Sequence, residues 1–478
     1  MYSASLHSRY NPQGEAERYI DSLSLNEKTR YFILIEPGLG YIVAPLKRKA
    51  PHAKVIALHA EKPSQIPAVQ GPAAQADSQW YPETGVSVQE FLEAEIPDSQ
   101  AFEIRLLEWR PALNVYGQLY RALVDEAATF IKRSDANART TKAFGSRWFK
   151  NFFKNLSIIK TVISPVRPVN DNLVVSSPLL VTGAGPGLEE AIPVIKSVVP
   201  GGLFVLASSS SIAALEANDL TPDLAISTDG SYWARLHLFN SFRNNSKKKE
   251  ACPLAVALTA ALPSQCNALP VLVISDGSLW QTLILRELQI PFVALPQRGT
   301  VTAVALDLAF ALTGGQIYIA GMDLENRDMR SHARPYSFDI LIEEKASRAN
   351  PAYSQTYKRS SLLKAGGSYD IYASWFEKQL PNYPRPLYSI GKNNSIFESQ
   401  KTALPSATEQ GTAVLKFQPI PLNFASSPCE NALTVLENGL KDPAQSEALQ
   451  KELKSLILPE NRAVSQTELI DLIRSWTE

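Results

Sequence analysis

Short apolar runs alternate with amphipathic segments through the middle of the chain. Runs that predict buried strands lie at 178–182, 203–207, 223–228, 271–275, 291–295 and 316–320. Segments with helical spacing of their apolar residues lie between them, at 187–198, 210–218, 279–288 and 301–313. Pro193 is expected to kink or shorten the first of these helices. Strands that alternate with helices form a mainly parallel sheet covered on both faces, so we expect a Rossmann-like α/β domain over residues 173–400.

The first part of the chain, residues 1–120, has the pattern of a smaller α/β unit. Apolar strands are expected at 30–35 and 54–58, joined by a turn and a short helix. Glu61 follows the second strand, where an acid often holds a ribose, but Pro37 stands in the turn where glycine is usual. We therefore favour a degenerate βαβ unit with a structural role over a working cofactor site.

Helical patterns dominate the two remaining regions. Residues 121–172 predict a helical connector, and its basic and aromatic run 147–154 is either a docking surface for a protein partner or a face packed on the next domain. Residues 401–478 predict a linker with Pro and Ser followed by a helical C-terminal region, including helices over 445–458 and 467–476. We expect these helices to serve packing or oligomerisation and to carry no chemistry.

Length, charge and cysteine content limit the classes of partner. The chain has 478 residues, which is too many for a single core. Its 47 basic and 47 acidic residues balance, so neither a nucleic acid nor a membrane surface is indicated as a partner. Three cysteines without metal-ligand spacing, and no apolar run of signal-peptide or membrane length, predict a cytoplasmic protein.

A glycine-rich turn joins the first strand of the central pattern to its helix. Gly183, Gly185 and Gly187 alternate with other residues, and Pro186 precedes the last of them. Glycines let the backbone pass close to a ligand, and the N–H groups of the following helix attract an anion such as phosphate. We expect a phosphate site here, although such turns also arise for purely steric reasons.

Polar residues also follow the next two strands. Ser208 and Ser209 bring hydroxyls to a position where a ribose or phosphate would lie, although helix capping is the commoner role of such serines. Asp223 precedes the third strand and Asp229 follows it. An acid followed by glycine at a strand end is a frequent ligand contact or catalytic carboxylate, and the alternative is a turn aspartate.

Two further groups follow the last two strands of the pattern. Arg298, Gly299 and Thr300 lead into a helix and suit a carboxylate or phosphate. Asp323 follows the final strand, and His332 lies nine residues beyond it. Histidine has an unperturbed pKa near working pH, so His332 is a candidate general base or acid, with an isolated surface histidine as the alternative.

In this order, the motifs resemble the motility-associated factor (Maf) family. The family pattern Gly-x-Gly-Pro-Ser-Leu is similar to residues 183–188, and its Pro-Asp with a strand ending in Asp is similar to 222–229. Its Gly-x-Asp-Leu with a later histidine is similar to 321–332. Short matches at 11–18, 38–41, 375–376 and 388–393 extend the resemblance over about residues 10–400.

The resemblance implies a bacterial cytoplasmic glycosyltransferase with a sialyltransferase-like central domain, required for flagellar assembly and motility. Such an enzyme transfers a nonulosonic acid, pseudaminic or legionaminic acid, from a CMP-activated donor to Ser or Thr of flagellin. The implied partners are flagellin and the nucleotide-sugar donor. No resident cofactor is implied, and Asp229 and Asp323 leave the need for a divalent metal open.

Together, the motifs and the resemblance predict a division of roles. The phosphate would lie on Gly183, Gly185, Pro186 and Gly187, and Ser208 or Ser209 with Asp229 would contact the nucleoside. Asp223 is expected among the residues that bind the substrate or nucleotide. The sugar carboxylate or the phosphate would meet Arg298, Gly299 and Thr300. The expected catalytic residues are His332, which takes the acceptor proton or assists the leaving phosphate, with Asp229 and Asp323.

Two departures from the family pattern keep other functions open. Gly187 stands where the family usually has serine, and Pro37 interrupts the N-terminal turn. The central pattern also resembles archaeal pyrophosphokinases that move a diphosphate from ATP to a hydroxymethylpterin, which would need Mg²⁺. A third interpretation is a non-catalytic protein that binds flagellin or assists its export.

Overall fold

The computed structural model describes residues 6–62, 76–96, 102–166, 176–239, 252–327, 329–362, 368–397, 415–458 and 464–477. The chain forms two compact units, Met1–Gly145 and Ser146–Glu478, called here the N-terminal and C-terminal units. The division falls inside the long helix α5 (Gln118–Ile158). The segment expected as a separate connector is thus shared between the units, and its final part forms strand β5 (Thr161–Pro165) of the larger sheet.

A four-stranded parallel sheet forms the centre of the N-terminal unit. Its strands run in the order β3-β2-β1-β4: β1 (Tyr31–Ile35), β2 (Lys54–Leu58), β3 (Ser78–Trp80) and β4 (Ile104–Glu108). Its helices are α1 (Pro12–Ser22), α2 (Val43–Lys49), α3 (Val88–Glu95) and α4 (Leu113–Tyr116). The two strands and the short helix expected for a βαβ unit are confirmed, and β3 and β4 extend the sheet.

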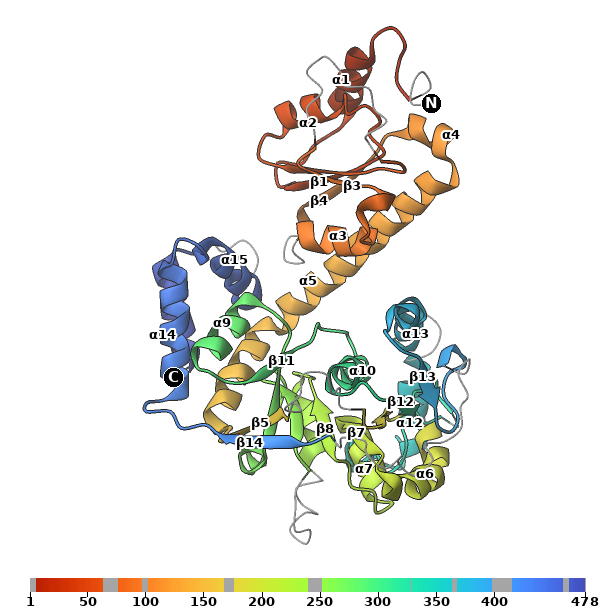
Figure 1. Ribbon diagram of the computed structural model, residues 1–478, viewed down its shortest axis with the longest axis vertical. Helices are drawn as coiled ribbons and strands as arrows, with labels where there is room; N and C mark the ends of the chain where they lie inside the picture. Colours follow the sequence, from red (N-terminus) through yellow and green to blue (C-terminus); the bar gives the residue numbers. More distant parts are fainter. Residues whose placement is uncertain are drawn as a thin grey trace. The chain divides into compact units, whose positions relative to one another are not determined.

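A ten-stranded sheet forms the centre of the C-terminal unit (Figure 1). Its order is β13-β12-β6-β7-β8-β9-β10-β5-β14, and β11 pairs with β10. All of its pairs are parallel except that of β14 with β5. Besides β5, the strands are β6 (Leu179–Thr182), β7 (Phe204–Ser208), β8 (Leu224–Ser227), β9 (Leu254–Ala257), β10 (Val271–Ser275), β11 (Phe292–Ala294), β12 (Ile317–Ala320), β13 (Leu387–Ser389) and β14 (Phe417–Pro421).

Helices cover both faces of this sheet, so the expected Rossmann-like α/β architecture is observed. Besides α5, the helices described in this unit are α6 (Gly187–Val198), α7 (Ile212–Glu216), α9 (Leu279–Glu287), α10 (Val301–Leu312), α11 (Asp339–Lys345), α12 (Ala352–Leu362), α13 (Ser368–Gln379), α14 (Pro428–Lys441), α15 (Ser446–Ile457) and α16 (Gln466–Thr477). The six strands and four helices expected in the central pattern are all confirmed within a few residues.

Alternate residues of each strand enter two separate cores. On one face, Leu180 and Val205 pack with α5, α6 and the C-terminal helices. On the other face, Val181 and Leu206 pack under α10, which lies across β6, β7 and β8. Because successive side chains of a strand point to opposite faces, a strand buried on both sides must be apolar throughout, as β6 largely is.

The aromatic run at the end of α5 belongs to the first of these cores. Phe149, Phe152 and Phe153 are buried, and Phe152 lies 4.7 Å from Trp280 of α9 between ring centres. A protein-docking surface would need these rings at the surface. The structure therefore supports the packing interpretation of the run 147–154.

The C-terminal helices also pack on this core. Helices α14 and α15 lie against α9 (Figure 1). Leu436 of α14, Leu449 of α15 and Leu469 of α16 are fully buried. Glu452 of α15 accepts the Leu279 and Trp280 N–H groups, at 3.0 and 2.9 Å, and so caps the first turn of α9. The helices expected over 445–458 and 467–476 are thus confirmed, and their apolar faces are buried within this unit.

Pro193 does not shorten α6, contrary to one of the two outcomes expected for it. The helix continues to Val198 with Pro193 inside it. The proline side chain is exposed, whereas Ile192 and Ile195 beside it are buried. Burial of the apolar face stabilises the helix enough to outweigh the hydrogen bond that proline cannot donate.

Candidate functional site

The C-terminal unit has a reversal of strand order between β6 and β12. From β6 the chain proceeds outward to β7, β8, β9 and β10, and α10 then returns it to β12 on the other side of β6. Ligands of open α/β sheets bind at the carboxyl ends of the strands where the order reverses. The turn after β6 and the loop after β12 meet at this point, and they carry two of the motifs found in the sequence.

The glycine turn after β6 packs directly on the loop after β12. A Cβ atom on Gly183 would lie less than 3.0 Å from the Gly321 carbonyl oxygen, and one on Gly185 less than 3.0 Å from the Asp323 carboxylate. A Cβ on Gly187 would meet both the Lys392 carbonyl oxygen and Asp323. Close approach to the protein's own chain therefore explains why glycine occupies these three positions.

Backbone N–H groups of this turn have acceptors within the chain. Gly183 and Gly185 donate to the carbonyls of Ala320 and Gly321, both at 2.8 Å. Gly187 donates to Oδ1 of Asp323 at 2.8 Å. The expected phosphate cradle thus needs correction, because these three N–H groups are not directed at a ligand in this state. Pro186, which has no N–H, is buried in the same turn.

Asp323 is buried at the N-terminus of α6. Its Oδ1 accepts from Gly187 and from Nη2 of Arg327, each at 2.8 Å, whereas its buried Oδ2 has no hydrogen-bond partner among the described residues. Burial raises the pKa of this carboxyl to about 6, and the neighbouring arginine and N–H group offset only part of the cost of desolvation. Asp323 therefore holds the turn and Arg327 together from inside the protein, rather than facing a substrate.

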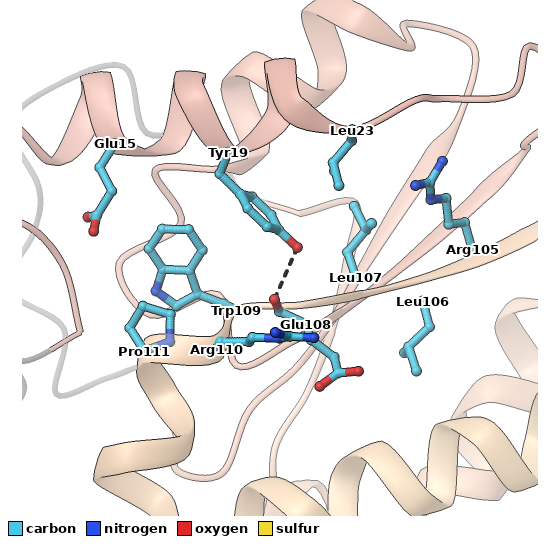
Figure 2. A pocket seen from close by; sticks show the side chains of 10 residues that line it. All are labelled: Glu15, Tyr19, Leu23, Arg105, Leu106, Leu107, Glu108, Trp109, Arg110 and Pro111. Carbon is cyan, nitrogen blue, oxygen red and sulfur yellow. Dashed lines mark hydrogen bonds between the residues drawn. The ribbon is translucent and has the colours of Figure 1, made fainter.

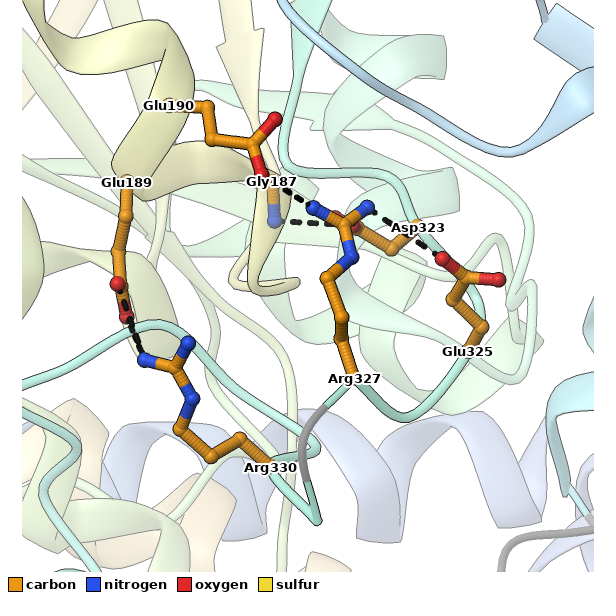
Figure 3. Close-up of polar contacts among 7 residues, drawn as sticks. All are labelled: Gly187, Glu189, Glu190, Asp323, Glu325, Arg327 and Arg330. Atoms are coloured by element: carbon orange, nitrogen blue, oxygen red, sulfur yellow. Dashed lines mark hydrogen bonds and ion pairs between the residues drawn. The ribbon is translucent and has the colours of Figure 1, made fainter.

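Two arginines follow Asp323 and pair with acids on the first turn of α6 (Figure 3). Nη1 of Arg327 lies 2.7 Å from Glu190, and Nη1 of Arg330 lies 2.8 Å from Glu189. The side chains of Arg327 and Arg330 are 20% and 26% exposed, so both guanidinium groups reach the surface. They bring positive charge to the switch point of the sheet.

His332 lies beside these arginines. Its Nδ1 is 2.8 Å from the Ser331 hydroxyl, and its ring stacks on Tyr336 at 4.0 Å. The next residue, Ala333, donates its N–H to the carbonyl of Ala184 in the glycine turn at 2.8 Å. When the imidazole donates its Nδ1 proton to Ser331, its Nε2 carries the lone pair that a general base requires.

The serines after β7 lie at the same edge of the sheet but are buried. Ser208 and Ser209 are 0% and 2% exposed. The Ser208 hydroxyl lies 3.3 Å from that of Ser210. Contact of a ligand with these two hydroxyls would require the surrounding loops to move.

The two candidate aspartates lie at opposite ends of strand β8. Asp223 precedes the strand and accepts the Val205 N–H at 2.7 Å, so it is at the amino end of β8 and apart from the other candidates. This corrects its expected role among the residues that bind the substrate or nucleotide. Asp229 lies at the carboxyl edge, is exposed, and accepts the Ser231 N–H at 2.7 Å as a turn aspartate does.

The expected second anion site has partners within the protein. Nε of Arg298 donates to Asp307 at 2.6 Å, and its guanidinium lies 5.5 Å from the Trp375 ring centre. Thr300 caps α10 by accepting the Ala303 N–H at 3.0 Å, and Gly299 supplies a left-handed turn before it, with φ of 68°. Capping and an internal ion pair thus account for these three residues in this state.

Arg327, Arg330 and Ser331 are the functional candidates that sequence reasoning missed. The available signal was an Arg-x-x-Arg-Ser-His run that follows the Gly-Met-Asp-Leu motif after two intervening residues. Only the fold reveals that these arginines pair with Glu189 and Glu190, more than 130 residues earlier in the chain. The isolated bridge between Arg327 and Arg330 fixes the loop that carries them.

The corresponding edge of the N-terminal unit is filled by the chain itself. His7 accepts the Leu39 N–H at 2.9 Å in the turn after β1, and burial lowers the pKa of its imidazole to about 4. Buried Glu36 accepts the Ala60 N–H at 2.6 Å, and Glu61 is exposed. These contacts occupy the position at which a nucleotide would approach.

A surface pocket of about 530 Å³ lies on the N-terminal unit between α1 and β4 (Figure 2). The Tyr19 hydroxyl crosses it to the Glu108 carbonyl at 3.0 Å. Its charged lining residues are two arginines and two glutamates: Arg105, Arg110, Glu15 and Glu108. This balance of charge favours neither anionic nor cationic ligands.

The described part of the chain has neither a cluster of metal-binding side chains nor a membrane-spanning helix. None of its His, Cys, Asp and Glu residues form a group of three or more arranged to bind a metal ion. No helix within the same residues has the length and apolar character needed to span a membrane.

One family model matches part of the C-terminal unit. Residues 150–329 match the family model described as 6-hydroxymethylpterin diphosphokinase MptE-like. This range contains the glycine turn, β6 to β12, Asp323 and Arg327, and it ends before Arg330 and His332.

Two individual proteins are also similar to this chain. An uncharacterized protein of Treponema pallidum (strain Nichols) is 28% identical over 296 residues, which are 62% of this chain. The match spans 61% of the length of that relative. The structure of a Maf glycosyltransferase from Magnetospirillum magneticum AMB-1 aligns over 98% of this chain and 82% of that chain, with a TM-score of 0.49 and 11% identity.

Proposed function

We propose that this protein is a glycosyltransferase that moves a nonulosonic acid, of pseudaminic or legionaminic type, from a CMP-activated donor to Ser or Thr hydroxyls of flagellin. The reaction would take place in the bacterial cytoplasm before flagellar assembly. The observation that carries the proposal is the meeting of the glycine turn, the Arg327–Arg330 pair and His332 at the switch point of the sheet. The ordered motifs that resemble the Maf family support it.

The arginines are assigned to the anionic groups of the donor. A CMP-sugar of this type has one phosphate and one sugar carboxylate, and a guanidinium binds either with paired hydrogen bonds. Glu189 and Glu190 already occupy Arg330 and Arg327. The donor would therefore take the place of at least one glutamate, and binding would depend on the cost of separating that ion pair.

His332 is assigned to the acceptor. The imidazole takes the proton of the Ser or Thr hydroxyl as the sugar–phosphate bond breaks and the new sugar–oxygen bond forms. Ser331 and the stacked Tyr336 orient the ring. Asp323 is assigned a positioning role, since it anchors both Arg327 and the glycine turn.

Binding of CMP by the purified protein tests the donor class. We expect CMP to raise the melting temperature without added metal, because a ligand that binds only the folded state stabilises it by mass action. Arg330→Ala should weaken this effect. Arg474→Ala is the matched control, since Arg474 forms a surface ion pair with Glu437 at 2.7 Å on the C-terminal helices. Equal CMP responses of wild type and Arg330→Ala would contradict the assigned role of the arginine.

Transfer to flagellin is tested separately by mass spectrometry of flagellin from a deletion strain that expresses each variant. His332→Ala is expected to leave a folded protein that cannot modify flagellin. Full modification by this variant would remove His332 from the mechanism. A folded wild-type protein that binds CMP but leaves flagellin unmodified would contradict the acceptor assignment.

The match of residues 150–329 to the MptE-like family supports a second candidate, transfer of diphosphate from ATP to a pterin alcohol. That reaction requires Mg²⁺ bound to the nucleoside triphosphate. A melting-temperature increase with ATP and Mg²⁺, and none with CMP, would favour this candidate. If neither nucleotide binds, a non-catalytic flagellin-binding role remains.

A further inference from the structure

Two neighbouring aromatic side chains are half exposed at the carboxyl edge of the large sheet. Tyr232 and Trp233 are 50% and 52% exposed, and they begin the short helix η7 (Tyr232–Arg235), which follows Asp229 beyond the end of β8. Their rings meet edge to face at 5.2 Å. Large aromatic rings are usually buried, so an exposed adjacent pair at a sheet edge marks a surface for contact with a ligand or a protein.

The segment that carries these rings is firmly held. Asp229 accepts the Ser231 N–H, and Asn151 of α5 donates to the Gly230 carbonyl at 3.3 Å. On the other side of the ring pair, Ala234 and Leu238 are each 1% exposed. The exposure of Trp233 therefore does not come from a loosely packed loop, and its ring would lose little freedom when a ligand stacks on it.

The same segment contacts the loop that carries His332. His237 stacks on Phe338 at 4.6 Å, with an angle of 15° between the rings, and it lies 5.6 Å from Tyr336. Tyr336 in turn stacks on His332 at 4.0 Å. The loops after β8 and β12 therefore meet through a run of aromatic rings, although β6 and β7 separate their strands in the sheet.

The position of Trp233 in the sheet indicates which part of a ligand its indole would contact. In the order β12-β6-β7-β8, strand β8 is two positions from β6, which is about 10 Å across the sheet. That distance is comparable to the length of a nucleoside monophosphate. With its phosphate at Arg327 or Arg330, such a ligand would direct its base toward the loop after β8.

The two rings are not equivalent as stacking surfaces. The guanidinium of Arg235 lies 3.6 Å from the Tyr232 ring centre and also bonds to the Tyr232 hydroxyl. The Tyr232 ring therefore already has a partner on one face. Trp233 offers the larger π surface, and base–indole stacking is independent of base identity.

We propose that Trp233 is the stacking surface for the nucleobase of the donor, with Tyr232 supporting its edge. This inference rests on the proposed function, because it names the subsite for the base of the CMP-activated donor. It assigns a substrate contact to a residue outside the glycine, arginine and histidine motifs.

Calorimetric titration of the full-length protein with CMP and with ribose 5-phosphate tests the subsite. Trp233→Ala should lower affinity for CMP by about fivefold to more than a hundredfold, because stacking contributes about 1–3 kcal/mol per base. Affinity for ribose 5-phosphate, which has no base, should stay unchanged. Trp233→Phe should retain most of the CMP affinity, since a phenyl ring still stacks.

Tyr353→Ala is the matched control, because Tyr353 on α12 is 67% exposed and lies on another element. The inference is overturned if Trp233→Ala binds CMP like wild type, or if it loses CMP and ribose 5-phosphate affinity equally. Normal CMP binding with weakened flagellin binding would also overturn it and would make the ring pair a protein contact. Wild-type protein that binds no CMP would overturn the proposed donor as well, which separates the two failures.

Discussion

Packing within the protein explains the glycine at position 187, where the sequence predicted a contact with phosphate. A side chain at this position would collide with the Lys392 carbonyl oxygen and with Asp323. We therefore expect Gly187→Ser, which restores the residue usual in the resembled family, to lower the free energy of unfolding by about 1–3 kcal/mol. Urea denaturation measures this change.

The control for Gly187→Ser is Lys196→Ala on the exposed side of the same helix, with an expected change within about 0.5 kcal/mol. If Gly187→Ser is as stable as wild type, the neighbouring carbonyl can move aside without cost. The steric explanation for the glycine would then be wrong.

Asp323 predicts a specific pH dependence of stability. Burial raises its pKa to about 6 in the folded protein from an ordinary value of 3.8, so the folded chain binds the proton more tightly than the unfolded chain. The resulting stabilisation is complete below pH 3.8 and is lost as the pH rises through 6. Across this range the loss is about 3 kcal/mol, at 1.36 kcal/mol per pKa unit.

Comparison with Asp323→Asn isolates this effect, because asparagine does not ionise. The free energy of unfolding of wild type minus that of the variant should fall as the pH rises from 4 to 7. Chemical denaturation at several pH values provides the measurement. A difference that stays constant with pH, or that increases, would show that Arg327 and the Gly187 N–H fully offset the burial of the carboxylate.

At the scale of elements, Glu452 joins the C-terminal helices to the sheet domain. Glu452→Ala removes the acceptor of two N–H groups in the first turn of α9, and we expect unfolding to become easier by about 1–2 kcal/mol. Glu452→Gln keeps an acceptor oxygen and should lose less. Urea denaturation of both variants, with the exposed Glu447→Ala as control, distinguishes a cap from a surface charge.

Six strands and four helices of the central pattern were predictable from apolar runs and from helical spacing, but the buried strand β9 (Leu254–Ala257) was missed. β14 was not predictable, because Pro419 and Pro421 lie within it and proline is rare in strands except at sheet edges, which is where β14 lies. β13 has only three residues, Leu387–Ser389, too few for a recognisable pattern.

The candidate site was predictable only where its signal is local. The glycine turn and Asp323 each lie in a short motif directly after a strand, His332 lies further along the loop after β12, and the fold brings these residues together. The pairing of Arg330 with Glu189 depends on which strands become neighbours, and that choice is made by packing of the whole sheet. For the same reason, the sequence did not reveal that Asp323 would be buried or that Asp307 would bind Arg298.

At the scale of the whole molecule, the apolar residues fall into separate cores. The core of the N-terminal unit includes Phe32 and Leu92, and those of the C-terminal unit begin at Phe149. Each unit therefore has the buried surface needed to unfold cooperatively by itself. Helix α5 is shared between them, so its two ends belong to different cooperative units.

We therefore expect two transitions in calorimetry of the full-length chain. Leu92→Ala in α3 and Leu453→Ala in α15 each remove a fully buried side chain, at a cost of about 2–5 kcal/mol. Leu92→Ala should lower the melting temperature of the N-terminal unit by roughly 10 °C and leave the other transition in place. Leu453→Ala should lower only the second transition. A single transition that both substitutions shift equally would mean that α5 couples the two cores into one cooperative structure.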